Sequence, residues 1–312
     1  MKDVPFLNQD KPLLPILAGI LIAFLFGFSF LFSKQSLNTM APMELLAHRF
    51  TLASLLLILL IAVKFIQIRW NWHLLFDLLP LAVFQPLLYF LGETYGIKYT
   101  SASESGIIIS LTPVAVTLLE VIFLKERVKL QQWFLIMMTV LGVVLIVLAG
   151  SAHVFQRHLW GILALLIAVI AASVFNILSR KSSRFYTPIE ITVVRMVTAA
   201  VFFNCLRLVT MSPTEHYFGA FLQRDSLFGL LYLGLACSVG AFFLMNYMLN
   251  KMPAFQVATF VNLTTVISVM AGVIFRKESF GGYHIIGTIL ILGGVGGLNL
   301  TVYKRPNKLK IK

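Results

Sequence analysis

Two arginines, Arg49 and Arg195, lie inside long apolar stretches of the sequence. An arginine at the centre of a membrane helix costs about 2.5 to 3.5 kcal/mol on the insertion scale, so its presence calls for a physical reason. A guanidinium can make two parallel hydrogen bonds to an oxyanion, which suits it to holding a closed gate or to pairing with an anionic solute. We predict a gating role for Arg49 and Arg195. The alternative is that each side chain reaches back along its helix to the membrane surface.

Uncharged polar side chains also occur near the middle of the apolar stretches, where hydrocarbon offers no hydrogen-bond partner. Gln85 precedes Pro86, whose missing N–H leaves the Ala82 carbonyl without its helical partner. Such groups are tolerated in membranes where they are buried in protein or line a polar cavity. For each residue taken singly, a hydrogen bond between helices is the alternative. We predict that the following residues line a central solute-binding cavity: Gln85, Tyr89, Asn176, Tyr247 and Asn262.

The acidic residues give a weaker indication of chemistry. Glu44 and Glu190 fall in the first turn of their expected helices, where a carboxylate interacts favourably with the helix dipole. Glu93, Glu104 and Glu120 are expected near helix ends rather than at the membrane centre, which favours a position at the interface over proton transfer. The spacing of the histidines and cysteines indicates no metal site, and we expect no metal ion or cofactor.

The elements that must position these residues are membrane helices. The chain of 312 residues is 59% hydrophobic and has a mean hydropathy of +0.91, which leaves too little polar surface for a water-soluble globule. A helix needs about 20 predominantly apolar residues to cross the hydrocarbon core of a bilayer. Ten stretches of about this length are expected to be membrane helices: 13–32, 43–63, 75–95, 101–123, 131–149, 159–178, 189–209, 227–249, 255–275 and 283–302.

The two halves of the chain, 1–150 and 151–312, repeat the same pattern. Three residues recur with identical spacing, so that Pro42, Glu44 and Arg49 correspond to Pro188, Glu190 and Arg195. Five more recur at a slightly different offset, so that Tyr95, Ala102, Lys125, Glu126 and Gly142 correspond to Tyr247, Ala254, Lys277, Glu278 and Gly294. Each half contains five expected helices, and because five is odd, the second half enters the membrane with the opposite orientation. The Lys-Glu pairs are expected to be solvated helix ends.

The positive charge indicates how the chain is oriented. The net charge is +13, and the Lys and Arg residues lie mostly in short connections and in the C-terminal tail. With both termini in the cytoplasm, 16 Lys and Arg residues fall on the inner side and 7 on the outer side, as the positive-inside rule favours. We therefore expect a multi-pass protein of the plasma (inner) membrane with both termini cytoplasmic. Its partners are expected to be the lipid bilayer and a small-molecule substrate, and no nucleic acid.

Short motifs in both halves carry a resemblance to known proteins. They are Phe26-Gly27, Lys34, Pro42, Arg49, Tyr99 to Ala102, Pro113, Lys125-Glu126 and Gly142, then Gly161, Pro188, Arg195, Pro253-Ala254, Lys277-Glu278 and Gly294. Together they resemble the EamA-type branch of the drug/metabolite transporter superfamily over nearly the whole chain. The second half departs from the first where Pro113 is matched by Thr265, so the two halves are not required to bend alike. The resemblance implies secondary transport of small metabolites, often the export of amino acids or related compounds.

Residues and resemblance together predict an all-α membrane protein of ten transmembrane helices in two inverted five-helix repeats. The expected function is secondary transport of a small metabolite, an amino acid or related compound, by alternating access, with export as the expected direction. A channel or a non-transporting membrane sensor is the alternative. An intramembrane enzyme is a further alternative, although the chain has no H-E-x-x-H, G-x-S-x-G or Walker loop. We expect the chain to act as a monomer or a homodimer.

Overall fold

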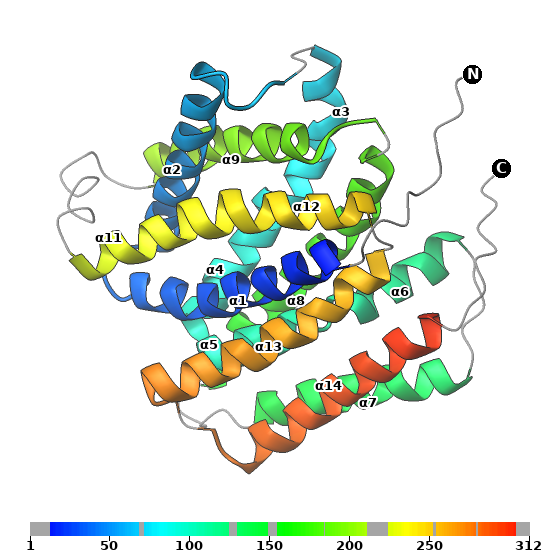
Figure 1. Cartoon of the computed structure of the whole chain (residues 1–312). Helices are drawn as coiled ribbons and strands as arrows, with labels where there is room; N and C mark the ends of the chain where they lie inside the picture. Colours follow the sequence, from blue (N-terminus) through cyan, green and yellow to red (C-terminus); the bar gives the residue numbers. More distant parts are fainter. Residues whose placement is uncertain are drawn as a thin grey trace.

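The computed structural model describes residues 13–68, 72–124, 130–148, 155–183, 185–210, 224–251, 254–278 and 280–303. All regular elements in these ranges are helices (Figure 1). The first half contains α1 (Leu13–Ser36), α2 (Pro42–Ala62), α3 (Trp72–Ala82), η1 (Val83–Leu88), α4 (Tyr89–Tyr99), α5 (Ala102–Ile109), α6 (Thr112–Leu124) and α7 (Leu130–Leu148). The second half contains α8 (Phe155–Ser182), α9 (Pro188–Thr210), α11 (Arg224–Leu231), η2 (Tyr232–Ala241), α12 (Phe242–Lys251), α13 (Ala254–Arg276) and α14 (Gly282–Tyr303).

The lengths of the helices fit a membrane protein. Within the described residues, 7 helices are long and apolar enough to span a bilayer, and they fall on seven of the expected stretches. Shorter apolar helices at Leu130–Ile146, Leu263–Arg276 and Gly282–Gly297 fall on the other three. The chain is therefore a multi-pass membrane protein.

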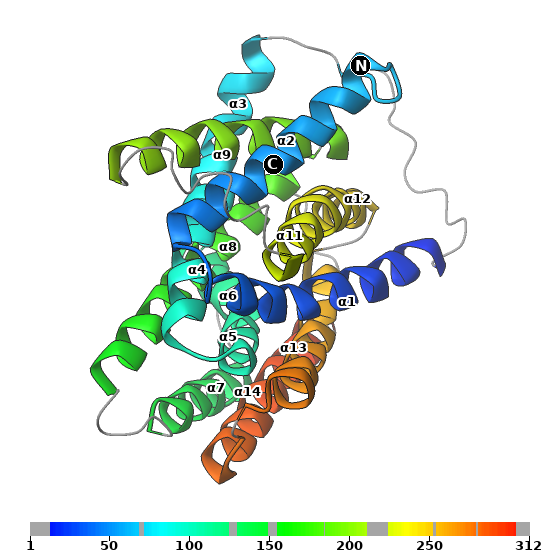
Figure 2. The same ribbon diagram turned by 90° about the vertical axis from the view of Figure 1, so that its left-hand side faces the viewer.

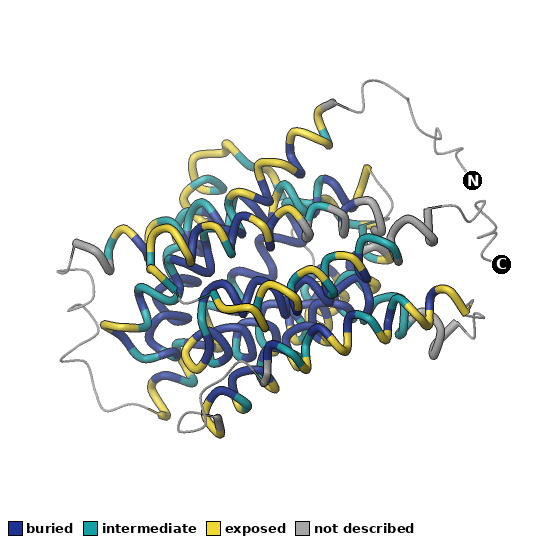
Figure 3. The backbone as a smooth tube through the Cα atoms, turned by 90° about the horizontal axis from the view of Figure 1, so that it is seen from below, coloured by how far each residue is buried: buried dark blue, intermediate teal, exposed yellow. Residues whose placement is uncertain are grey.

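The helices turn large apolar side chains outward as well as inward. On α1, for example, Leu14, Leu17, Leu21 and Phe24 recur at helical spacing and are each about half exposed. Figure 3 shows exposed residues along the outward faces of the helices and buried residues between them. In water such a surface would be unfavourable, whereas in a bilayer it is the face in contact with lipid.

Helices of the first half pack mainly against helices of the second half. In the middle of the molecule, α1 packs along α13 and α4 along α8, while α2 packs against α9 and α7 against α14 at its two edges. Figures 1 and 2 both show α2, α3 and α9 at one edge of the stack and α7 and α14 at the other. Each of these pairs takes one helix from each half, so neither half forms a bundle of its own.

Close approach of backbones holds the α7 and α14 pair. A Cβ atom at Gly142 would lie 2.7 Å from the Gly287 carbonyl oxygen, and one at Gly287 would lie 2.8 Å from the Gly142 carbonyl oxygen. Gly294 faces α7 as well, because its Cβ would lie 2.7 Å from the Leu135 carbonyl oxygen. The small residues of the last helix therefore serve contacts within the monomer.

Each half contains a π-helical segment at an equivalent place, η1 before α4 and η2 before α12. Gln85, inside η1, has extended backbone angles (φ −144°, ψ 113°), so the helix is interrupted just before Pro86. In η2, the Ser238 hydroxyl donates to the Leu233 carbonyl 2.8 Å away, five residues earlier, which matches the wider π-helical turn. Both interruptions lie in the interior of the molecule.

The halves bend differently elsewhere. The helix that contains Pro113 is broken between α5 and α6, whereas α13, which has Thr265 at the corresponding position, continues from Ala254 to Arg276. Thr265 instead donates a hydrogen bond to the Gly106 carbonyl at 3.2 Å. The loss of proline in the second half therefore removes one bend and adds one contact between the halves.

Candidate functional site

The centre of the molecule contains two phenylalanines at equivalent positions in the two halves. The rings of Phe90, in α4, and Phe242, in α12, meet edge to face with centroids 5.9 Å apart. The guanidinium of Arg49 lies over the Phe90 ring at 4.3 Å. The guanidinium of Arg195 lies over Phe242 at 4.9 Å and over Phe175 at 4.1 Å. The cations therefore flank the aromatic pair, one in each half.

Both arginines point into the protein and not to the membrane surface. Arg49 is 3% exposed and Arg195 is 0% exposed. Arg49 Nε donates to the Ser238 hydroxyl at 2.9 Å, and Arg195 Nε donates to the Gln85 carbonyl at 2.7 Å. Each arginine thus binds the interrupted helix of the opposite half. A side chain that reached back along its own helix to the membrane surface would not make this contact.

The surroundings of the two arginines differ in charge. Arg49 Nη1 lies 3.9 Å from Glu93 Oε2, and Tyr89 donates to Glu93 Oε1 at 2.7 Å. The position that corresponds to Glu93 in the second half is Met245. Among the described residues, Nη1 and Nη2 of Arg195 have no hydrogen-bond partner. The repeat therefore places a cation in both halves but a carboxylate beside only one of them.

The structure brings some of the predicted cavity residues together around these arginines. Gln85 is 4% exposed and contacts Arg195 through its carbonyl. Its side-chain Oε1 is buried, as is Oδ1 of Asn176, which follows Phe175 on α8, and neither oxygen has a partner within the described ranges. Tyr89 lies on the Arg49 side, bound to Glu93.

The other two predicted cavity residues are Tyr247, which lies in a different cluster, and Asn262, whose side chain is outside the described residues. Tyr247 packs against an apolar cluster that includes Ala18 and Ile22 of α1, away from the arginines. Asn262 is in α13, but its side chain is outside the described residues. Asn246, one position before Tyr247, is 1% exposed and donates to the Thr192 hydroxyl at 2.9 Å. Because Thr192 is one helical turn from Arg195, Asn246 is a neighbour of this site.

One end of the bundle, here called the Tyr186 end, is hollowed. A cavity of about 620 Å³ is lined by Gln67, Ile68, His73, Leu74, Phe185, Tyr186, Thr187, Ile189 and Glu190. Tyr186 donates a hydrogen bond to the Asp77 carboxylate, which raises the pKa of Tyr186 to about 12. The phenol therefore stays protonated at neutral pH. A buried apolar layer shares Leu74 with this cavity and contacts Arg195 through Phe175. The layer consists of Leu74, Leu78, Leu81, Phe175, Ile191 and Val194.

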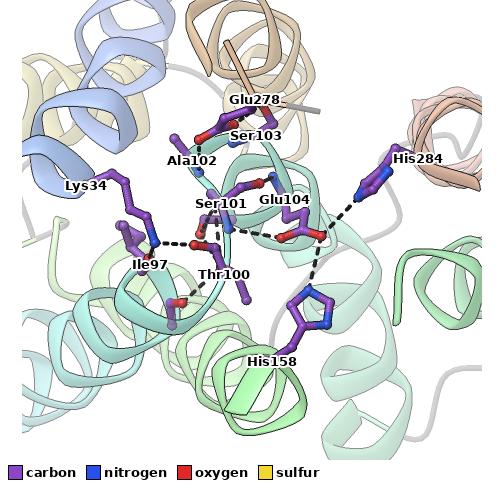
Figure 4. Close-up of polar contacts among 12 residues, drawn as sticks. Lys34, Ile97, Thr100, Ser101, Ala102, Ser103, Glu104, His158, Glu278 and His284 are labelled. Atoms are coloured by element: carbon purple, nitrogen blue, oxygen red, sulfur yellow. Dashed lines mark hydrogen bonds and ion pairs between the residues drawn. The ribbon is translucent and has the colours of Figure 1, made fainter. Parts of the chain in front are cut away.

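The opposite end, here called the Glu278 end, is closed by contacts with free helix ends (Figure 4). Lys34 donates to the carbonyls of Ile97, at 2.7 Å, and Lys98, at 3.1 Å, and also to that of Thr100. The C-terminal end of α4 is thereby capped by a side chain of α1. The smaller cavity of about 380 Å³ at this end is lined by Lys98, Tyr99, Arg157 and Trp160.

A carboxylate caps the next helix at the same end. Glu278 accepts from the backbone N–H groups of Ala102 at 2.9 Å and Ser103 at 3.0 Å, and from the Ser103 hydroxyl at 2.6 Å. The sequence-based prediction that Lys277-Glu278 is a solvated helix end is therefore wrong for Glu278, whose side chain is 12% exposed. The prediction failed because the N-terminus that it caps lies about 175 residues earlier in the chain.

Glu104 joins three helices beside this cap. Its Oε1 accepts from Nε2 of His158, on α8, and from Nε2 of His284, on α14, both at 3.1 Å. Its Oε2 accepts from the Ser101 backbone N–H at 2.9 Å, as part of a capping box at the start of α5. The sequence-based analysis missed this cluster, although the Ser101 to Glu104 spacing is a capping-box signal. Among the described residues, no group of three or more His, Cys, Asp or Glu residues is arranged to hold a metal ion.

The first-turn carboxylates behave as expected. Glu190 Oε2 accepts from the Thr187 backbone N–H at 2.8 Å, and Glu44 Oε2 accepts from the Ala41 N–H at 3.4 Å. Each carboxylate therefore closes a capping interaction within its own helix start.

Comparison with known proteins gives this architecture a family. The EamA-like transporter family matches the chain twice, over residues 13–148 and 159–300. The chain belongs to the EamA-like transporter family. Like the other members, it is a membrane transporter, and the family is not one of enzymes.

Individual relatives agree with the family match. The chain is 31% identical over 304 residues to the uncharacterised transporter YcxC of Bacillus subtilis (strain 168), with 96% of this chain and 97% of the relative covered. It is 26% identical over 270 residues to an uncharacterised transporter of Archaeoglobus fulgidus, with 86% and 92% covered. A solved crystal structure shares the fold with a TM-score of 0.65 at 18% identity, and the match covers 93% of this chain and 97% of that one.

Proposed function

We propose that this chain is a secondary transporter that exports a small metabolite, an amino acid or a related compound, across the plasma membrane by alternating access. Its ten transmembrane helices form two inverted repeats, residues 1–150 and 151–312, and both termini are cytoplasmic. It acts within the lipid bilayer as a monomer or a homodimer.

The observation that carries this proposal is the difference between the two ends of the bundle. Side-chain caps from Lys34 and Glu278 join the helices at one end, where the cavity measures about 380 Å³, while the Tyr186 end has a larger cavity of about 620 Å³. Buried polar groups lie between them. Alternating access requires this combination, since a carrier with both ends open would leak.

The charge distribution supports an orientation for the two ends. The Tyr186 end carries basic residues, including Lys64, just after α2, and Lys181, in the last turn of α8, so the positive-inside rule favours placing it in the cytoplasm. We therefore propose that the Glu278 end faces outward and is the closed end.

We assign the residues around the two arginines to the transport cycle. Gln85, Tyr89, Asn176, Tyr247 and Asn262 are proposed to line the solute path at different stages. Arg49 and Arg195 are proposed to gate it, because each binds the interrupted helix of the opposite half. Breaking one of these contacts would release η1 or η2 from its neighbour.

Solute flux into proteoliposomes tests the proposal. The purified chain should exchange a labelled metabolite from a panel of amino acids, nucleobases, sugars and organic cations, and the flux should saturate with concentration. Gln85→Ala should reduce this flux at least about tenfold. Leu55→Ala should leave the flux unchanged, because Leu55 is 58% exposed and lies on the lipid-facing surface. Flux that rises linearly with concentration would indicate a channel instead.

A further inference from the structure

The Arg195 guanidinium is the unusual charge of this molecule. It is completely buried, and no carboxylate among the described residues lies within ion-pair distance of it. Its Nε is bonded to the Gln85 carbonyl, and its face is covered by Phe175 and Phe242. Nη1 and Nη2, the two nitrogens that normally hold an oxyanion, have no partner among the residues that the structure describes.

Arg49 shows what a compensated arginine looks like in the same fold. It occupies the same repeat position, lies over the equivalent phenylalanine and binds the equivalent interrupted helix. Unlike Arg195, it also lies beside a carboxylate, that of Glu93. Because a buried cation without an anion is costly, the missing carboxylate at Met245 leaves a charge that something else must balance.

We propose that the Arg195 guanidinium binds the anionic group of the transported solute, a carboxylate in the simplest case. This inference deepens the proposed transport function and rests on it. The solute then supplies the charge that Glu93 supplies to Arg49. Binding of the solute also determines how firmly Arg195 holds η1. Occupancy of the site is thereby linked to the gate.

Buried acceptors on segments that contact Arg195 or its helix add a second requirement. Among the described residues, no partner is found for the side-chain oxygens of Gln85, of Asn176, which follows Phe175, or of Asn246, which binds Thr192. The orientation of the Asn246 amide is fixed by its neighbour, because the Thr192 hydroxyl donates to the Pro188 carbonyl at 2.8 Å and must accept from Asn246 Nδ2. The solute is therefore expected to carry hydrogen-bond donors as well as an anionic group.

The route to this site runs from the Tyr186 end. Glu190 lines the cavity there, and Arg195 lies five residues further along α9, about 8 Å deeper along the helix axis. Leu74 lines the cavity and belongs to the same apolar layer as Phe175, which contacts Arg195. Movement of this layer would admit a small solute to the guanidinium.

Thermal unfolding of the full chain in lipid nanodiscs tests the charge argument without any ligand. Arg195→Met removes an uncompensated buried cation and should raise the unfolding temperature by several degrees. The matched variant Arg49→Met leaves Glu93 buried without its cation and should lower the unfolding temperature. If Arg195→Met lowers the unfolding temperature as much as Arg49→Met does, the charge is already balanced and the proposal is wrong.

Binding of defined probes tests the anion site itself. The probes are the twenty protein amino acids and their carboxamides, compared at equal ionic strength by the shift in unfolding temperature of the wild-type chain. At least one amino acid should bind about 10- to 100-fold more tightly than its carboxamide. The difference should disappear in Arg195→Met and shrink in Arg195→Lys, which keeps the charge but not the planar pair of donors.

The outcomes distinguish failure of the anion site from failure of the transport function. Equal binding of acids and carboxamides, or binding that survives Arg195→Met, overturns the anion site. The absence of any acid binding also overturns it for carboxylates. Binding that depends on Arg195 without flux in proteoliposomes would retain the anion site and reject the transport function.

Discussion

At the scale of single residues, two arginines of common origin in the repeat have different electrostatic surroundings. Arg49 forms a buried set with Glu93, Tyr89 and Ser238, whereas Arg195 is held by one carbonyl and two aromatic rings. A buried ion pair is costly to break from one side, because the partner that remains is left charged in an apolar environment. We therefore propose a structural and gating role for Arg49 and a solute-binding role for Arg195.

The Arg49 and Glu93 pair gives a prediction in the form of a double-mutant cycle. Arg49→Met should destabilise the folded chain by about 3 kcal/mol, since it leaves a buried carboxylate unpaired. Adding Glu93→Gln to that variant should restore at least about 1 kcal/mol. The measurement is the change in unfolding free energy in detergent micelles or nanodiscs. Strict additivity of the two single changes would show that the groups do not interact across their 3.9 Å separation.

At the scale of elements, helix pairs that join the two halves depend on small residues. The α7 and α14 pair approaches most closely where Gly142 and Gly287 face each other's carbonyl oxygens. Association of helices in lipid relies on close packing, because lipid chains solvate apolar side chains as well as another helix does. A single methyl group at such a crossing must therefore push the helices apart.

Two glycine substitutions test this packing. Gly142→Ala should lower the stability by about 1 to 3 kcal/mol, because its Cβ would lie 2.7 Å from backbone and side-chain atoms of α14. Gly296→Ala is the matched control in the same helix pair, since nothing lies within 4 Å of its Cβ, and it should be neutral or slightly stabilising. The effect of both substitutions on stability would be measured by heating each variant and determining how much soluble, monodisperse protein remains. A neutral effect of Gly142→Ala would mean that the two helices are free to separate.

At the scale of the whole molecule, the closed end is built from contacts between separate elements. Lys34 of α1 caps α4, and Glu278, just after α13, caps α5. Glu104 connects α5 to α8 and α14 through two histidines. A change of state that opens this end must exchange all of these hydrogen bonds for water, so the contacts set the free-energy difference between the two states.

Glu278→Gln should weaken this closure and favour opening of the Glu278 end. The carboxamide retains one acceptor oxygen but loses the charge that suits three donors. The readout is the rate at which a membrane-impermeant thiol reagent modifies Ser105→Cys, a buried position beneath the cap, after the native Cys205 and Cys237 are replaced. The rate should increase about tenfold or more.

Glu44→Gln serves as the control for this measurement. In the part of the chain that the structure describes, the Glu44 carboxylate bonds only at the start of its own helix. The substitution therefore removes a comparable charge without loosening a described contact between elements. Equal rates in the two variants would show that Glu278 does not hold the end closed.

The sequence by itself determined the membrane setting, the helices and the duplication. Apolar stretches of spanning length, repeated spacing and family resemblance are all properties of the chain in one dimension. The helix starts at Glu44 and Glu190 were also predictable, because a capping interaction joins residues only three positions apart. The disturbance of the helix at Pro86 was predicted from its missing N–H, and the structure shows the interruption at the preceding residue, Gln85.

Only the tertiary structure decided which polar groups meet. Helices that are apolar around their whole circumference give no pattern that fixes their rotation, so the sequence could not show that Arg49 faces Glu93 while Arg195 faces no carboxylate. The cap from Glu278 to Ser103 spans 175 residues, and the contact from Arg49 to Ser238 spans 189. Such contacts arise because each half packs against the other, and the small differences between the halves at these contacts give the two arginines different surroundings.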